Sequence, residues 1–264
     1  MKEWDLIVDD TPLDGSWNMA VDDYLFQSLT DELQTSLRFY SWKNPTVSLG
    51  YSQKVLEVAD VEFCQKNGID IVRRMTGGKL VLHHKEVTYS LTSSDTEIFT
   101  SNLNDSYRLI SEALMKGLKM MGLAPALASP APQEYVRGNL PCFSYPSRNE
   151  VEVLGKKIIG SAQKRVGTKF IQHGSIPIEE DDDLLTSISF LELADEEIRM
   201  ISLTEALDRP IDFNQAVGIF TQGIEEYFDI QLKRRILSDS DNESIRQIHK
   251  EKYGNPTWTF GSSP

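Results

Sequence analysis

The sequence contains few residues that could tie the chain together through disulfides or metal ions. Among its 264 residues are two cysteines, Cys64 and Cys142, and four histidines. Two cysteines cannot build a disulfide framework, and free thiols are typical of a reducing compartment, so we expect a cytoplasmic protein. His83 and His84 are adjacent, and no histidine or cysteine pair has the spacing of zinc ligands. We therefore expect no metal site.

Long hydrophobic runs are missing as well. No run of about 18 apolar residues occurs, so a membrane-spanning helix is not expected. The N-terminal stretch MKEWDLIVDD carries charges where a signal peptide would have its apolar core, which argues against secretion. With 40% hydrophobic and 25% charged residues, the composition is typical of a globular protein. We expect residues 1–264 to form one domain and the protein to be a monomer.

Positive charges are outnumbered by negative charges: the chain has 27 Lys and Arg residues and 40 Asp and Glu residues, so its net charge is −13. Binding to nucleic-acid phosphates needs a basic surface, so nucleic acid is not an expected partner. The positive charges that are present concentrate in residues 73–85 and 140–165. Such segments on an acidic protein indicate a site for an anion or an acidic partner, or simply solvated surface, and the pattern leaves both open.

Hydrophobic periodicity predicts helices and strands in a mixed order. Apolar residues recur at helical spacing in residues 17–28, 105–121, 213–228 and 240–248, and the last segment opens with the capping-box spacing of Ser240 and Glu243. Strand-like stretches occupy residues 37–42, 46–51 and 169–178, and residues 149–160 are typical of a hairpin that turns at Gly155. Because helices and hairpins do not alternate as βαβ units, we predict an α+β fold with a mixed, largely antiparallel sheet and flanking helices.

The segment VRRMTGGKLVLHHKEVTYSL, residues 72–91, is typical of two strands joined by a glycine turn. Gly77 and Gly78 would let the backbone approach a ligand closely, and Arg73, Arg74 and Lys79 could contact an anion. The same pattern also fits an ordinary tight turn without a ligand.

The segment LPCFSYPSRNEVEVLGKKIIGSAQKR, residues 140–165, places Cys142 before the hairpin that carries Lys157. A nearby ammonium group favours the thiolate, which is the nucleophile in thiol chemistry. Lys157 could also hold the carbonyl oxygen of a thioester, as could the backbone N–H groups of Gly160, Ser161 and Ala162. The spacing leaves open that Cys142 is instead an ordinary packing residue.

Five segments together resemble the catalytic domain of the biotin/lipoate protein ligase family. These segments are NMAVDDYLF, RFYSWKNPTVSLGYSQ, RRMTGGKLVLHHKEVTYSL, CFSYPSRNEVEVLGKKIIGSAQKR and FIQHGSIPI. They follow the family's order over residues 16–178, with a weaker similarity in KYGNPTWTF. The resemblance implies that family's fold over residues 1–264, and we expect no ligase accessory domain.

Within this family the chain is most similar to cysteine-dependent octanoyltransferases of the LipM type. A cysteine, Cys142, lies where ATP-dependent lipoate ligases usually carry Arg-Asn-Asp. The resemblance implies that Cys142 accepts the acyl group and that Lys157 binds the substrate. The residues that match the family's acyl-pocket loop are Arg74, Gly77, Gly78 and His83. Met75, Lys79 and His84 depart from the family's pattern, which leaves the exact role of the loop open.

The reaction that the resemblance implies is a two-step octanoyl transfer in lipoate biosynthesis. Cys142 would take the octanoyl group from acyl carrier protein and pass it to a lysine of a lipoyl domain, such as the glycine-cleavage H protein. Thioester chemistry of this kind needs no cofactor. Three alternatives remain open: an ATP-dependent lipoate-protein ligase, an amidotransferase acting between lipoyl domains, and a carrier-binding module without catalysis.

Overall fold

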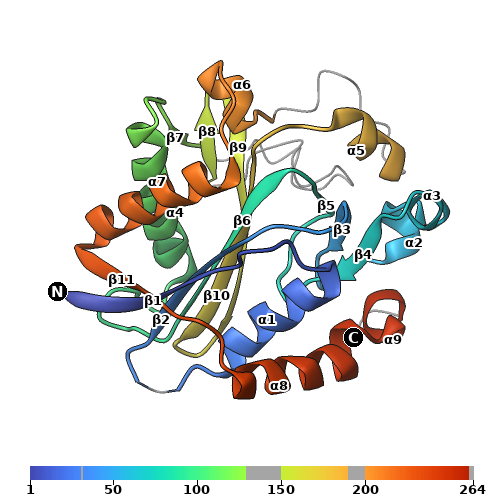
Figure 1. The fold of residues 1–264 in the computed structure, drawn as a ribbon, viewed down its shortest axis with the longest axis horizontal. Coiled ribbons are helices and arrows are strands. Elements are labelled where there is room, and N and C mark those ends of the chain that lie inside the picture. The colour runs from blue at the N-terminus through green and yellow to red at the C-terminus, as the bar shows by residue number, and fades with distance from the viewer. Residues whose placement is uncertain (31, 129–149, 190–199, 262–264) are drawn as a thin grey trace.

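An eight-stranded sheet forms the centre of the structure (Figure 1). The computed structural model describes residues 1–30, 32–128, 150–189 and 200–261. In spatial order the strands are β11 (Ile230–Arg234), β1 (Lys2–Val8), β2 (Thr35–Tyr40), β6 (Glu86–Ser93), β10 (Lys169–Pro177), β9 (Lys156–Val166), β8 (Val151–Val153) and β7 (Ala126–Leu127). β1 pairs in parallel with β11 and β2, and the remaining neighbours pair antiparallel. The predicted α+β class and mixed, largely antiparallel sheet are confirmed.

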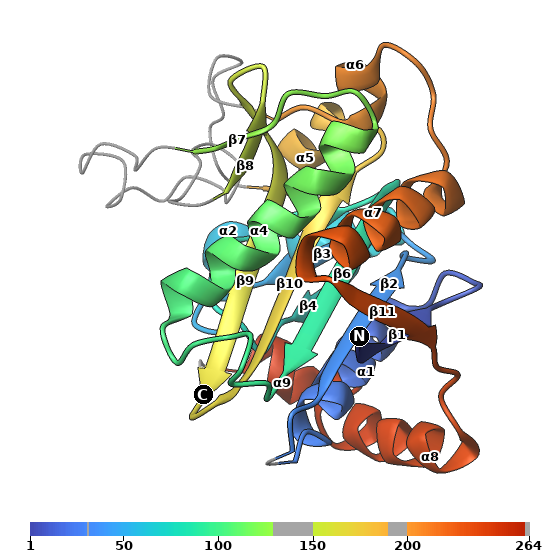
Figure 2. The same ribbon diagram turned by 90° about the vertical axis from the view of Figure 1, so that its left-hand side faces the viewer.

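Two long helices cover one face of this sheet, as Figure 2 shows. They are α4 (Leu103–Met120) and α7 (Phe213–Phe228), and the short helix α6 (Leu203–Leu207) precedes α7. The two helices approach closely because they meet at glycines. A Cβ atom on Gly117 would lie 2.7 Å from the Phe220 ring, and one on Gly223 would lie 2.6 Å from the Gly117 nitrogen. The main core lies between these helices and the sheet.

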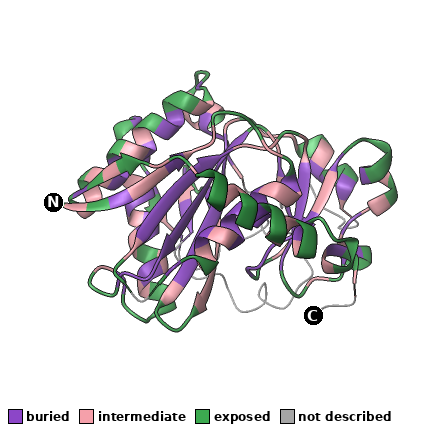
Figure 3. Cartoon of the chain, turned by 60° about the horizontal axis from the view of Figure 1, so that its bottom comes forward, coloured by how far each residue is buried: buried purple, intermediate pink, exposed green. Residues whose placement is uncertain are grey.

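The opposite face carries α1 (Gly15–Gln27), with the C-terminal elements packed behind it. These elements are α8 (Asp239–Ile248), the π-helix η2 (His249–Tyr253) and α9 (Pro256–Phe260). α1 lies between the sheet and α8, and its apolar side chains form a second core with Ile245 and Tyr253. Figure 3 shows that the middle of the central sheet, formed by β2, β6 and β10, is buried, whereas the outer sides of the helices are exposed.

A second, three-stranded sheet lies beside the first and supports the glycine turn. Its strands are β4 (Asp70–Arg73), β3 (Thr46–Leu49) and β5 (Val81–His83), and the helices α2 (Val55–Val58), α3 (Val61–Lys66) and α5 (Asp182–Ile188) pack against it. Cys64 is fully buried in this core, and burial raises the pKa of its thiol to about 11. This cysteine therefore packs as a small apolar residue. Across the described ranges, every helix is too short or too polar to span a bilayer.

Candidate functional site

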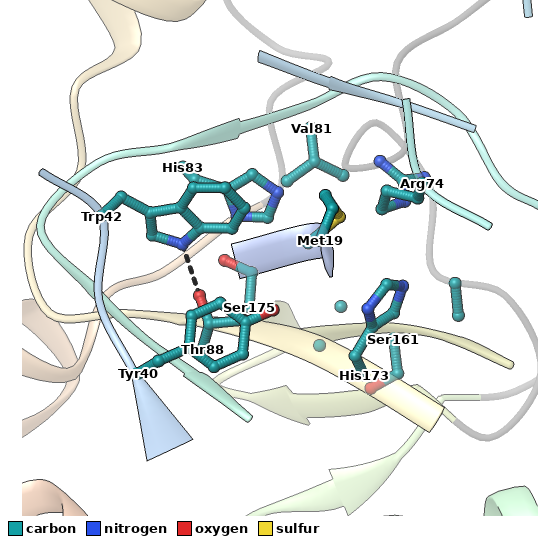
Figure 4. A pocket seen from close by; sticks show the side chains of 13 residues that line it. Met19, Tyr40, Trp42, Arg74, Val81, His83, Thr88, Ser161, His173 and Ser175 are labelled. Carbon is teal, nitrogen blue, oxygen red and sulfur yellow. Dashed lines mark hydrogen bonds between the residues drawn. The ribbon is translucent and has the colours of Figure 1, made fainter. Parts of the chain in front are cut away.

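A pocket lies on the face of the central sheet that α1 covers (Figure 4). It contains about 410 Å³ of empty space, including its mouth. Five separate stretches of the chain line it, and their residues are Met19; Tyr40 and Trp42; Arg74, Val81, His83 and Thr88; Gly160, Ser161 and Ala162; and His173, Gly174 and Ser175. The mixture of apolar walls with a few polar groups is typical of small-molecule sites.

Strand register explains why residues so far apart in the sequence meet here. Tyr40 pairs with Thr88, Thr88 pairs with Ser175, and Ser175 pairs with Gly160. Directly paired residues point to the same face of a sheet, so this row across four strands lines one wall of the pocket. His173 lies two residues from Ser175 on β10 and therefore points to the same face.

Glu86 fixes the position of the aromatic wall. This residue is 4% exposed, and it accepts hydrogen bonds from Trp42 Nε1 at 3.2 Å, from Ser175 Oγ at 2.5 Å and from the Thr88 hydroxyl. His83 Nδ1 lies 2.8 Å from a Glu86 oxygen, and the Trp42 and His83 rings stack 4.2 Å apart. Because a carboxylate can only accept, the hydrogen-bond partners assign the Nδ1–H tautomer to His83. His83 is thus held as a wall of the pocket.

Arg74 shapes the glycine turn from inside. Its guanidinium donates to the carbonyl oxygens of Gly77 at 3.1 Å and Lys79 at 2.9 Å, and to the Ser48 carbonyl and hydroxyl at 2.7 and 2.6 Å. Gly78 has a φ of +97°, a conformation that favours glycine. Arg74 and His83 both line the pocket, whereas Gly77 and Gly78 lie on the adjoining turn.

His173 is the polar centre that sequence reasoning missed. Its Nδ1 lies 3.1 Å from Asp22 Oδ2, and its Nε2 lies 2.7 Å from Thr76 Oγ1. Burial lowers the pKa of His173, and the neighbouring Asp22 opposes this only in part. Burial would raise the pKa of Asp22, but hydrogen bonding to His173 and the charge of Arg38 hold it below its ordinary value. The pair is therefore a neutral imidazole beside a carboxylate.

The predicted glycine-serine-alanine stretch also reaches the pocket. Gly160, Ser161 and Ala162 line it from β9, the strand that carries Lys157. Ser161 Oγ lies 2.7 Å from the Tyr89 hydroxyl, and burial raises the pKa of Tyr89 to about 12. The Tyr89 hydroxyl is therefore protonated at neutral pH and can take part in a hydrogen bond with Ser161.

Lys157 lies outside the set of residues that line the pocket. Its ammonium group is 2.7 Å from Glu150 Oε1, and the two side chains are 0% and 2% exposed. Cys142 falls within residues 129–149, outside the described residues, and Glu150 is the first residue described after them. The contact between Cys142 and Lys157 that the sequence predicts thus stays a prediction.

Within the described residues, three cations of the two basic segments are buried rather than exposed. Arg73 is 0% exposed, Arg74 is 4% exposed and Lys157 is 1% exposed. Of the exposed members, Lys85 pairs with Glu179 and Lys156 with Glu205. Among the residues that the structure describes, no group of three or more His, Cys, Asp or Glu side chains is arranged to hold a metal ion.

Comparison with known proteins places this arrangement in a family. The model of the lipoyl protein ligase A/B catalytic domain matches residues 14–225. The chain belongs to this family. Among its relatives, the octanoyltransferase LipM of Carboxydothermus hydrogenoformans is 36% identical over 98% of this chain and 99% of that protein. The octanoyltransferase LipM of Anoxybacillus flavithermus is 34% identical, again over 98% and 99% of the two chains.

Solved structures of lipoyl protein ligases share the fold. The structure of lipoate-protein ligase A bound with ATP has a TM-score of 0.85 at 22% identity, over 98% of this chain and 99% of that chain. An archaeal bi-partite lipoate protein ligase studied with its E2 lipoyl domain, from Thermoplasma acidophilum, has a TM-score of 0.83 at 22% identity, over 99% and 98%. All pocket residues lie within the family's matched range, whereas α8, η2 and α9 lie beyond it.

Proposed function

We propose that the chain is an octanoyltransferase that moves an octanoyl group from acyl carrier protein to a lysine of a lipoyl domain. The observation that carries this proposal is the narrow pocket, with Met19, Trp42 and Val81 as apolar walls, in a chain of this family. Relatives of nearly the same length, 34% and 36% identical, are octanoyltransferases. The glycine-cleavage H protein is the acceptor that we propose.

The pocket provides the binding energy for the acyl chain. An octanoyl tail carries seven carbons beyond its carbonyl, and burial of each contributes about 0.8 kcal/mol, so the whole tail contributes roughly 5–6 kcal/mol. Trp42 is held in place by its bonds to Glu86 and Thr88, which keeps this wall rigid. A rigid wall limits the entropy lost on binding.

The proposed chemistry runs through a thioester on Cys142. In the first step Cys142 loses its proton, and its thiolate attacks the donor's carbonyl carbon. A new C–S bond forms, the donor's C–S bond breaks, and the released donor thiolate takes up the proton that Cys142 lost. In the second step the amine of the acceptor lysine attacks the same carbon. A C–N bond forms, the C–S bond to Cys142 breaks, and a proton passes from the amine to the sulfur.

Energetics explain why this transfer needs neither ATP nor a cofactor. The first step exchanges one thioester for another, and the second converts a thioester into a more stable amide. We propose that the Lys157 ammonium stabilises the negative charge that develops on the carbonyl oxygen in both steps. Its pairing with Glu150 at 2.7 Å holds the ammonium in place.

The test is the intact mass of the full chain after incubation with octanoyl-acyl carrier protein in the absence of ATP. We expect an octanoyl adduct that hydroxylamine removes and that Cys142→Ala abolishes. Cys64→Ala is the matched control, because the buried Cys64 thiol, with its pKa of about 11, should not react. Loss of the adduct in Cys64→Ala alone would contradict the assignment.

The other outcomes of this experiment identify the alternatives. An ATP-dependent product made by the Cys142→Ala protein would indicate a lipoate-protein ligase. Acylation by an octanoylated lipoyl domain, with none by the acyl carrier protein, would indicate an amidotransferase. Binding of the carrier protein without an adduct or a product would indicate a carrier-binding module.

A further inference from the structure

We propose that Arg73 is a positioning residue that couples the C-terminal helix α9 to the glycine turn of the pocket. Arg73 is the last residue of β4, and its neighbour Arg74 lines the pocket. Because successive side chains of a strand point to opposite sides, the two guanidinium groups diverge. Arg74 bonds directly to the glycine turn, whereas Arg73 bonds to α9 and to the 50–53 turn beside it.

The guanidinium of Arg73 joins two segments that are far apart in the sequence. Its Nε donates to the Trp258 carbonyl at 2.9 Å, and its Nη2 donates to the Thr259 carbonyl at 2.8 Å. Its Nη1 donates to the carbonyls of residues 50, 51 and 53 at 3.2, 2.9 and 2.6 Å. Trp258 Nε1 donates back to the Arg73 carbonyl at 3.0 Å. The buried guanidinium of Arg73 thus binds both α9 and the 50–53 turn.

The character of these bonds indicates a specific role. Arg73 is 0% exposed, and the five acceptors found within the described residues are all backbone carbonyls. Burial lowers the pKa of Arg73, which is the direction expected for a desolvated cation. A buried guanidinium is tolerated only where acceptors converge on it, so the two segments must keep their relative position for the site to be stable.

The 50–53 turn passes this constraint to the glycine turn. Tyr51 N donates to the Thr76 carbonyl at 2.8 Å. A Cβ atom on Gly50 would lie only 1.9 Å from the Gly78 carbonyl oxygen, so the two backbones are in direct contact. Displacement of the 50–53 turn would therefore displace Thr76 and Gly78 as well. Thr76 is also the partner of His173 in the pocket, at 2.7 Å.

The C-terminal elements also hold the second wall of the pocket, which is α1. His249 Nε2 lies 2.9 Å from Ser16 Oγ, and Lys252 Nζ lies 2.8 Å from Asp23 Oδ2. α1 carries Met19 into the pocket. Figure 1 shows α8 and α9 on the side of α1 and β4 that faces away from the central sheet. Elements beyond the family's matched range, residues 14–225, thus support both walls from outside.

Two substitutions test this coupling in the full chain. Arg73→Lys keeps the charge, but a single ammonium cannot reach the carbonyls of both segments. Trp258→Phe keeps a smaller aromatic ring and removes the donor to the Arg73 carbonyl. The control is Ile224→Ala in α7, which is 2% exposed and packs on the opposite face of the sheet. This control lowers stability without touching Arg73 or its partners.

The first measurement is hydrogen exchange without substrate. We expect faster exchange at the Tyr51 amide and at residues 76–79 in both variants, and wild-type exchange there in Ile224→Ala. The second measurement rests on the proposed function. We expect KM for octanoyl-acyl carrier protein to rise roughly tenfold or more in Arg73→Lys, with a smaller change in kcat. In Ile224→Ala we expect KM to stay within about twofold of the wild type, because loss of stability alone does not move the pocket.

The exchange and KM measurements can each overturn the positioning role of Arg73. Unchanged exchange at Tyr51 and residues 76–79 in a folded Arg73→Lys protein would overturn the proposal, as would equal changes in Ile224→Ala at the same loss of melting temperature. If Arg73→Lys does not fold, Trp258→Phe supplies the answer. Absence of octanoyl transfer in the wild-type chain would contradict the proposed function, and the exchange measurement would still decide the positioning role.

Discussion

The buried pair of Lys157 and Glu150 offers the sharpest prediction. Their side chains are 0% and 2% exposed, and the charged atoms are 2.7 Å apart. In Lys157→Met the carboxylate of Glu150 stays buried without this cation, and loss of one partner of such a pair costs about 3–5 kcal/mol. At about 2–4 °C per kcal/mol for a chain of this size, the melting temperature should fall by roughly 6–20 °C.

A double-mutant cycle isolates the pair from the other contacts of each residue. The free energy of unfolding would be measured in urea for Lys157→Met, for Glu150→Gln and for the double variant. Because methionine and glutamine carry no charge, the double variant should cost less than the sum of the single variants, with a coupling energy of about 2 kcal/mol or more. Single variants that each cost under about 1 kcal/mol and add without coupling would refute a desolvated ion pair.

The same cycle separates the stability role of Lys157 from its proposed chemical role. The double variant has no buried unpaired charge, so it should fold well enough for an acylation assay. If Lys157 stabilises the developing oxyanion, this variant should form the octanoyl adduct on Cys142 roughly a hundredfold more slowly. Adduct formation at the wild-type rate would show that Lys157 serves stability alone.

Three further predictions follow from local geometry. Gly50→Ala should destabilise the fold by about 1–3 kcal/mol, because its Cβ would meet the Gly78 oxygen at 1.9 Å, whereas Gly77→Ala has nothing within 4 Å and should keep the wild-type melting temperature. Burial and neighbouring carboxylates raise the pKa of Glu180 from 4.5 to about 7, so this residue lowers stability as pH rises through that window. Glu180→Gln should therefore raise the free energy of unfolding, measured in urea, by about 1–2 kcal/mol at pH 8 after screening, and leave it unchanged at pH 4. Leu154 has a φ of +55° and is 80% exposed, so Leu154→Asn should raise the melting temperature by about 2–4 °C.

Helix and strand positions could be predicted from the sequence where one pattern dominated. The apolar spacing of residues 213–228 matches α7, which spans Phe213–Phe228. The start of α8 was wrong because two capping boxes overlap in SDSDNES. The spacing of Ser240 and Glu243 predicted a start there, but Ser238 caps the helix and Asp241 completes the box. Both pairs fit the same rule, so the spacing alone could not select between them.

Pocket residues could be predicted from the sequence only where they belong to a contiguous motif. Arg74, His83 and the Gly160–Ala162 stretch belong to segments whose residue types already suggested ligand chemistry. Met19 and His173 were missed because a residue that lines a pocket and a residue of the core look alike in the sequence. Both lie on the buried side of their element, and only the pairing of four strands leaves a space beside them.

The two adjacent arginines also bear on which reaction the pocket performs. In the sequence they offer two guanidinium groups to an anion, as an ATP-dependent ligase needs for the phosphates of its substrate. In the structure Arg73 donates to five backbone carbonyls. Arg74 donates to the Ser48 carbonyl and hydroxyl and to the carbonyls of Gly77 and Lys79 in the glycine turn. A phosphate would have to displace buried carbonyls, each at a cost of about 1–3 kcal/mol. Transfer of an acyl group through a thioester on Cys142 makes no such demand. ATP with magnesium ions should therefore leave the rate of octanoyl transfer unchanged, and a rate that rises with ATP would return the ligase to consideration.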